Sequence, residues 1–188
     1  LHPLPAAYAT AMVAVPSLDQ ALVLLNRLQA ATGGAVEAFE FMPRTYIEAH
    51  LKTIAGARAP FAQSHEVNIM VEVAATAPRD TTPAADGTVP LSAHLEETLA
   101  QMFEEGLLLD AVVAQNEAQR KEMWERREAA AEVILGVGRP LSNNDIAVPV
   151  DKVGEFMGRM EARLAQIDPQ AVPVVVAHLG DGNIHYAV

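Results

Sequence analysis

Short apolar runs alternate with segments of helical periodicity along all 188 residues of the chain. Apolar runs bounded by Gly, Pro or polar residues are typical of buried strands, and apolar residues spaced three and four apart are typical of amphipathic helices. Strands are expected at 8–15, 35–41, 67–74, 107–114, 145–148, 172–178 and 184–186. Helices are expected at 17–33, 43–54, 91–105, 116–134 and 151–166, with an exposed loop at 75–90.

This order corresponds to two successive β-α-β units of similar size, joined by the polar loop. It predicts an α+β domain with a mainly antiparallel sheet flanked by helices, built from two β-α-β-type (ferredoxin-like) halves. A doubly wound parallel sheet shows the same alternation, and the pattern alone favours it about as strongly. The phosphate-binding signatures of that class, G-x-G-x-x-G and G-x-x-x-x-G-K-[ST], do not occur, so we do not expect this chain to bind a nucleotide.

Charge and composition exclude several functions. The chain has 13 Lys and Arg against 24 Asp and Glu, a formal charge of −11, and no basic run, which argues against nucleic-acid binding. An anionic ligand therefore requires a local positive centre. Cysteine is absent, so disulfides, thiolate zinc sites and a cysteine nucleophile are excluded. No apolar run reaches the roughly 18–20 residues of a membrane span, and a signal peptide is not recognisable, so we expect a cytoplasmic protein.

The end of the chain carries the clearest chemical pattern. A strand at 172–178 runs into a turn that contains two glycines, which tolerate positive φ, and the chain then returns. His178 and His185 flank this turn, so their imidazoles can converge, and Asn183 or Asp181 can add an oxygen. Such a set suits Zn, Fe, Mn or Co. The alternative is a plain hairpin whose histidines are ordinary polar residues, and the spacing does not decide between the two.

Residues 178–185, His-Leu-Gly-Asp-Gly-Asn-Ile-His, resemble the H-x-G-D-G-N-x-H signature of the C-terminal domain of FAD-linked oxidases, the family of D-lactate, glycolate and D-2-hydroxyglutarate dehydrogenases. Segments 10–17, 38–42, 123–128 and 145–149 are similar to further family segments in the same order. The resemblance implies a substrate, or cap, domain that lies over an FAD held by a separate N-terminal FAD-binding domain. We therefore expect residues 1–188 to form one such domain, incomplete at both ends.

The resemblance also implies roles for individual residues. His178 and His185 would bind a divalent metal (Zn, Fe or Mn) that holds the hydroxyl and carboxylate oxygens of a small 2-hydroxy acid. Arg127 stands at the family's W-x-x-R position and would bind the substrate carboxylate, a task suited to a guanidinium. Asn183 would contact the substrate or the metal, so Arg127 and Asn183 are the expected catalytic residues. Without the resemblance, Arg127 would be interpreted as a solvated arginine on a charged helix.

Two departures from the family pattern affect the expected site. Asn143, expected to bind substrate together with Arg127 and Asn183, stands where the family often has a lysine. A neutral amide cannot form an ion pair with a second carboxylate. Asn143 therefore argues against a dicarboxylic substrate such as 2-hydroxyglutarate. The family's E-H-G segment, with a carboxylate metal ligand and a neighbouring histidine base, would follow the hairpin by several tens of residues, and the chain ends before it.

Four other polar residues are interpreted without a function. Glu40 is expected to be a strand-end carboxylate, although it lies in a segment that resembles the family. His50, His65 and His94 are expected on helix or loop surfaces.

Together these patterns predict the substrate domain of an FAD-dependent D-2-hydroxyacid dehydrogenase, which would form a 2-oxo acid by hydride transfer to flavin. The isolated chain is expected to be inactive. The main alternative is a free-standing, non-redox domain that binds a metal or a small acid or mediates dimerisation. A two-histidine metallohydrolase would need a general base and a further ligand that the sequence does not clearly provide. The substrate, the metal, the residues that contact FAD and the formation of a homodimer stay undetermined.

Overall fold

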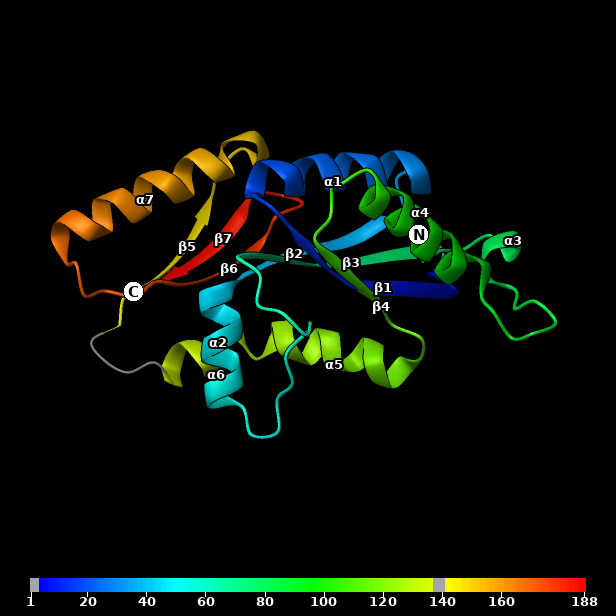
Figure 1. The fold of residues 1–188 in the computed structure, drawn as a ribbon, viewed down its shortest axis with the longest axis horizontal. Coiled ribbons are helices and arrows are strands. Elements are labelled where there is room, and N and C mark those ends of the chain that lie inside the picture. Colours follow the sequence, from blue (N-terminus) through cyan, green and yellow to red (C-terminus); the bar gives the residue numbers. More distant parts are fainter. Residues whose placement is uncertain (1–3, 137–140) are drawn as a thin grey trace.

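The computed structural model describes residues 4–136 and 141–188, and the strands of these residues form a single seven-stranded sheet (Figure 1). The strands are β1 (Ala7–Val15), β2 (Val36–Pro43), β3 (Val67–Ala75), β4 (Asp110–Val113), β5 (Asn143–Ala147), β6 (Val174–His178) and β7 (Asn183–Ala187). Their order is β4-β1-β3-β2-β6-β7-β5, and every neighbouring pair is antiparallel. The predicted antiparallel α+β class is confirmed, and the parallel alternative is excluded.

Both halves of the sheet are split β-α-β units. β1 and β2 each pair antiparallel with β3, so they run parallel to one another with β3 between them. β5 and β6 have the same relation to β7. Helix α1 (Leu18–Thr32) connects the first parallel pair and helix α7 (Val153–Ile167), preceded by a 3-10 turn at Val150–Lys152, connects the second.

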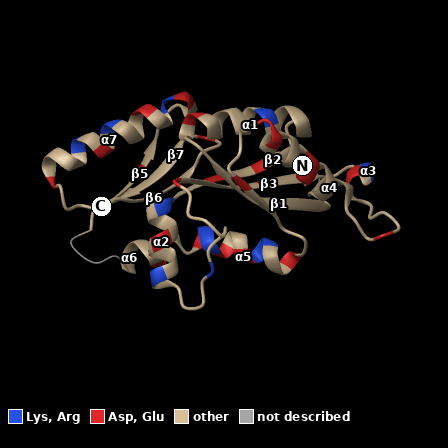
Figure 2. Ribbon diagram, viewed as in Figure 1, with Lys and Arg blue, Asp and Glu red and all other residues tan. Residues whose placement is uncertain are grey.

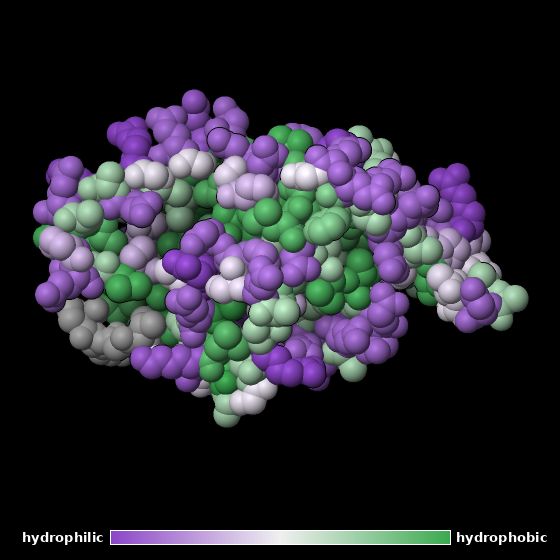
Figure 3. Space-filling view, in the orientation of Figure 1, coloured by the Kyte–Doolittle hydropathy of each residue, from purple (hydrophilic) through white to green (hydrophobic). Residues whose placement is uncertain are grey.

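Helices cover both faces of the sheet and separate its side chains into two cores. α1, α4 (Pro90–Glu104) and α7 lie on one face, whereas α2 (Arg44–Thr53), α5 (Glu117–Glu128) and α6 (Ala130–Gly136) lie on the other (Figure 1). Because successive side chains of a strand point to opposite faces, Val13 joins the first core and Met12 the second. Figure 3 shows hydrophobic residues also reaching the surface between hydrophilic ones on the face in view.

Helix α1 follows the expected local signals. Its N-cap residue, Ser17, accepts a hydrogen bond from the backbone N–H of Gln20 at 3.2 Å. The helix ends at Gly33, whose φ of 66° is the left-handed conformation that favours glycine at this position. No helix within the described ranges is long and apolar enough to cross a membrane.

Several expected boundaries are wrong. The helix predicted at 116–134 is two helices, because at Ala129 the backbone ψ is 0°, far from the helical value of about −42°. The predicted strand at 107–114 is confined to β4. Pro43 is the N-cap residue of α2 rather than a residue of its first turn. The loop at 75–90 contains the short helix α3 (Pro78–Thr81). The sequence offers Gly136 and Gly138 as the end of the helix expected at 116–134; α6 ends at Gly136, and Gly138 lies outside the described residues.

Candidate active site

A row of ionisable side chains crosses the sheet face that α5 covers. It consists of Glu72 on β3, Glu40 on β2, His178 on β6, His185 on β7 and Asp145 on β5. Glu40 is the direct cross-strand partner of His178, and His185 is the partner of Asp145. Figure 2 shows both basic and acidic residues on α5, which lies below the sheet in this view. The row and the helix together bring opposite charges into one layer of the molecule.

Glu40 joins two of the residues predicted from the sequence. Its carboxylate accepts a hydrogen bond from Nε of Arg127 at 2.7 Å and lies 2.9 Å from Nδ1 of His178. Glu40 is 4% exposed and Arg127 is 8% exposed. The interpretation of Glu40 as a strand-end carboxylate is therefore wrong, because it lies within β2 and forms a buried ion pair. Its position in the segment that resembles the family was the signal that could have identified it.

The contacts of His178 define the tautomer of its neutral ring. Nη2 of Arg127 lies 3.2 Å from Nε2 of His178. A guanidinium can only donate hydrogen bonds, so Nε2 is the acceptor, and Nδ1–H then donates to Glu40. A ligand that binds through Nε2 of His178 must consequently displace one N–H group of Arg127.

The two predicted histidines lie close together on the hairpin. Their ring centroids are 5.5 Å apart, and the ring planes are inclined by 76°. The hairpin requires glycine at Gly182, where φ is 80° and a Cβ would collide with the carbonyl oxygen of Val148. Asp181 accepts a hydrogen bond from the backbone N–H of Asn183 at 3.0 Å, so its carboxylate serves the turn.

Asp145 is a site residue that the sequence analysis did not single out. Nδ2 of Asn183 donates to its Oδ1 at 2.6 Å, and the same oxygen lies 3.9 Å from Nδ1 of His185. Asp145 thus connects the predicted catalytic amide to the second histidine. Asn143 lies two residues earlier on β5, exposed and opposite Ala187, at the edge of the site rather than within the cluster around Glu40.

A metal would find an incomplete set of ligands in this part of the chain. The described residues contain no group of three or more His, Asp or Glu that could hold an ion. His178 does have the carboxylate partner on Nδ1 that metal-binding histidines usually have. Its Nε2, however, faces Arg127. His178 and His185 can thus contribute two nitrogens at most, and an ion would need further ligands from other groups.

A small cavity of about 290 Å³ borders the cluster around Glu40. Glu40, His178 and Asp181 are among its lining residues, together with Gln29 of α1. Larger cavities of about 810 and 850 Å³ lie beside α7, and neither is lined by a predicted site residue. The small cavity is thus lined by candidate-site residues, although Gln29 belongs to the helix that covers the opposite face of the sheet.

The remaining histidines are partly misplaced by the sequence analysis. His50 is buried, since it shares the inner face of α2 with Tyr46, and His65 is half-buried, whereas His94 is exposed as expected. Burial lowers the pKa of His50, and the charge of Arg126 lowers it further. Burial raises the pKa of Tyr46 to about 12.

Comparison with known proteins agrees with the motifs. A match to the family "FAD linked oxidases, C-terminal domain" covers residues 4–188. A D-2-hydroxyglutarate dehydrogenase of Xanthomonas citri pv. viticola is 29% identical over 177 residues, which is 94% of this chain and 34% of that protein. The mitochondrial D-2-hydroxyglutarate dehydrogenase of Bos taurus is 28% identical over 190 residues, 99% of this chain and 31% of that protein. This chain thus spans about a third of the length of these relatives, and it belongs to the family of FAD linked oxidases, as their C-terminal domain.

Proposed function

We propose that this chain is the substrate-binding domain of an FAD-dependent D-2-hydroxyacid dehydrogenase, in which a further domain holds most of the FAD. The observation that carries the proposal is the cluster in which the buried Glu40 orients both Arg127 and the half-exposed His178 beside His185. Family membership and the names of the relatives support the same reaction class. The reaction removes a hydride from Cα of the acid, which passes to the flavin, and a proton from its hydroxyl, and it leaves a 2-oxo acid.

Arg127 is the proposed anchor of the substrate carboxylate. A guanidinium has five N–H donors, and two of those of Arg127 are directed at Glu40 and His178, so 5 − 2 leaves three for a ligand. The ion pair with Glu40 holds Nε of the guanidinium before the substrate arrives, which lowers the cost of ordering the side chain. The pair with Glu40 has no net charge and the chain carries −11, so Arg127 would recognise the carboxylate through its directed N–H donors rather than through a net positive charge.

A divalent metal is the second part of the proposal. Nε2 of His178 and a ring nitrogen of His185 would hold it, with the remaining ligands from groups outside this set, from water or from the substrate. When bound there, it would polarise the substrate hydroxyl and lower the pKa of that group. Glu40 would keep Nδ1 of His178 protonated and its Nε2 available, while Arg127 would turn from Nε2 toward the substrate. Asn183, held by Asp145, would add a polar contact at the same edge.

The substrate is proposed to be a small D-2-hydroxy acid. The relatives are named for D-2-hydroxyglutarate, a dicarboxylate. Asn143 lies on the exposed edge strand of the site and offers a second carboxylate no ion pair. We therefore expect a smaller preference for D-2-hydroxyglutarate over D-lactate than a lysine at this position would produce.

The test is a titration of the full-length protein that contains this chain with a panel of D-2-hydroxy acids while the flavin absorbance is followed. We expect one or more acids to bleach the flavin, and Arg127→Met to lower kcat/KM by about a hundredfold, since loss of a buried charge pair costs about 2–5 kcal/mol. Arg163→Met on exposed α7 is the matched control and should behave like the wild type. Binding of an acid without any flavin reduction would support the non-redox alternative and overturn the proposal.

A further inference from the structure

We propose that Glu72 is a positioning residue for Arg127: by holding Arg120 and Trp124, it fixes helix α5 at the place from which Arg127 reaches the site. The inference rests on the proposed function of Arg127 as the carboxylate anchor. Glu72 lies on β3, and its hydrogen bonds go to Thr10, Arg120 and Trp124 rather than to Glu40, Arg127 or His178, so the proposed effect passes through the helix.

The carboxylate of Glu72 is fully engaged by donors. It accepts hydrogen bonds from Nε of Arg120 at 2.8 Å, from Nη2 of Arg120 at 3.0 Å, from Nε1 of Trp124 at 2.8 Å and from Oγ1 of Thr10 at 2.6 Å. The two bonds from Arg120 form a bidentate pair, the arrangement that adds most geometric specificity. Burial raises the pKa of Glu72, but these bonds and the charge of Arg120 outweigh burial and leave the pKa below its ordinary value. Glu72 is therefore an ionised, buried anchor.

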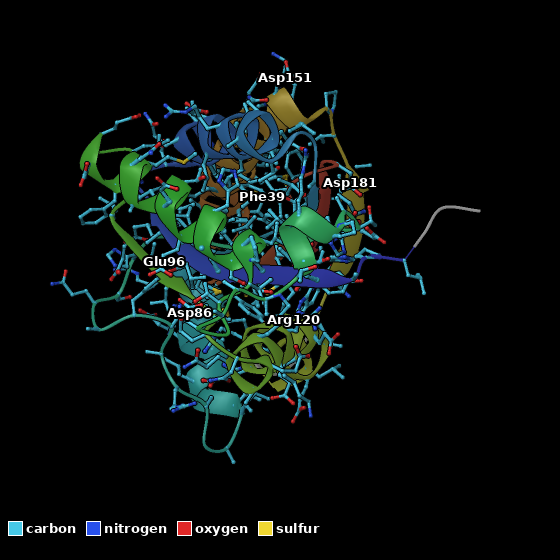
Figure 4. All side chains as sticks on the ribbon, turned by 90° about the vertical axis from the view of Figure 1, so that its right-hand side faces the viewer. Phe39, Asp86, Glu96, Arg120, Asp151 and Asp181 are labelled. Atoms are coloured by element: carbon cyan, nitrogen blue, oxygen red, sulfur yellow. The ribbon has the colours of Figure 1, made fainter. Side chains whose placement is uncertain are left out.

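Three anchored side chains of α5 lie on one stripe, and Arg126 is held separately by the backbone oxygen of Arg58. Arg120, Trp124 and Arg127 are spaced by four and three residues, so they lie on the same face of α5. The first two are held by Glu72 on β3, and the third is held by Glu40 on β2, the neighbouring strand. Two buried carboxylates thus fix two points of one rigid helix. Figure 4 shows Arg120 on the α5 side of the sheet.

Apolar packing contributes little to the placement of this helix. Met123 is buried and Trp124 packs half-buried against the same core, whereas the other buried side chains of α5 are Arg126 and Arg127. Directional polar contacts therefore carry much of the placement: Arg126 is held by Arg58 and Tyr46 at one end of α5, and removal of the Glu72 contacts should shift the end near Arg120 and Trp124 while the sheet cores remain. Small displacements are sufficient for an effect, because a misplacement of about 1 Å can reduce activity about a hundredfold.

The test is a double-mutant cycle in the full-length enzyme with the best D-2-hydroxy acid of the panel as substrate. Glu72→Gln keeps the shape of the side chain but faces its donors with an amide N–H₂ group. We expect it to raise KM about tenfold with a much smaller change in kcat, the signature of lost carboxylate binding. In the Arg127→Met background, Glu72→Gln should raise KM by less than about twofold, because the residue through which Glu72 acts is gone.

Two control variants separate positioning from general destabilisation. Glu105→Gln removes another bidentate acceptor, in the exposed pair with Arg27, and should leave KM unchanged. Leu28→Ala opens a cavity in the opposite core and should lower the melting temperature without an increase in KM.

A further variant keeps the test valid if Glu72→Gln does not fold. Trp124→Phe deletes a single donor to Glu72 and should raise KM by a smaller factor than Glu72→Gln.

The outcomes distinguish this inference from the proposed function. A wild-type KM in Glu72→Gln, or an equal increase in KM with and without Arg127, would overturn the positioning role. A wild-type KM in Arg127→Met would instead overturn the assignment of Arg127 as the anchor. A raised KM in Leu28→Ala would show that KM follows stability alone, and it too would count against Glu72.

Discussion

Replacement of Glu40 by glutamine should destabilise the domain far more than the loss of an exposed pair of the same type. Glu40 and Arg127 are 4% and 8% exposed, so the charge that remains on Arg127 would stay buried without its partner. Removal of one partner of a buried ion pair costs about 3–5 kcal/mol. Because the amide oxygen of the glutamine can still accept the hydrogen bond of His178, we expect a value near the lower end, about 3 kcal/mol.

This free energy can be converted into a shift of the melting temperature. An unfolding entropy of about 2.1 cal/mol/K per residue over 188 residues is about 0.4 kcal/mol/K, so 3 kcal/mol corresponds to a decrease of about 8 °C. Trp124 is the single tryptophan of the chain and lies on α5, so its fluorescence reports on the relevant region. Thermal and urea unfolding of the 188-residue chain followed by this signal is the assay.

Glu105→Gln is the matched control, since Glu105 also accepts two hydrogen bonds from one arginine but lies in solvent. Its melting temperature should stay close to that of the wild type, because water screens and replaces an exposed pair. If Glu40→Gln and Glu105→Gln shift the melting temperature equally, then the argument that burial makes the Glu40 pair indispensable is refuted.

Two further outcomes are expected. The pKa of His50 is lower in the folded chain than its ordinary value, so the stability that the neutral His50 contributes is fully present above about pH 6.5 and is lost as the pH falls toward the folded pKa. The free energy of unfolding should therefore decrease between pH 7 and pH 5. Urea titrations at each pH should show a smaller decrease for His50→Gln. Gly182→Ala should destabilise the chain and shift the ring signals of His178 and His185 in NMR spectra, because the added Cβ would collide with the Val148 carbonyl. Gly158→Ala on α7 is the control: a Cβ has open space there, so this change should be neutral or stabilise the chain by about 0.5–1 kcal/mol. A larger loss of stability in Gly158→Ala than in Gly182→Ala would contradict the role given to the Gly182 turn.

Local patterns in the sequence were sufficient for most of the secondary structure and for the hairpin. The Ser17 N-cap and the Gly33 stop follow from chemistry within one helical turn, and the predicted position of α1 is confirmed. The antiparallel class was also predicted correctly. The break at Ala129 was not predicted, since the residues around it all favour helix and only a change in backbone ψ separates α5 from α6.

For the site, the sequence by itself determined the motif residues His178, His185 and Asn183 and, through resemblance, Arg127. Only the tertiary structure decided the partners of these residues. Glu40 is 138 positions from His178 and 87 positions from Arg127 in the chain; sheet pairing brings Glu40 beside His178, and α5 brings Arg127 to both. A carboxylate in a strand carries no sign of which charge will be buried beside it, because that depends on strand order and on how a helix crosses the sheet. For this reason Glu40 looked unremarkable in the sequence, although it orients the site in the fold.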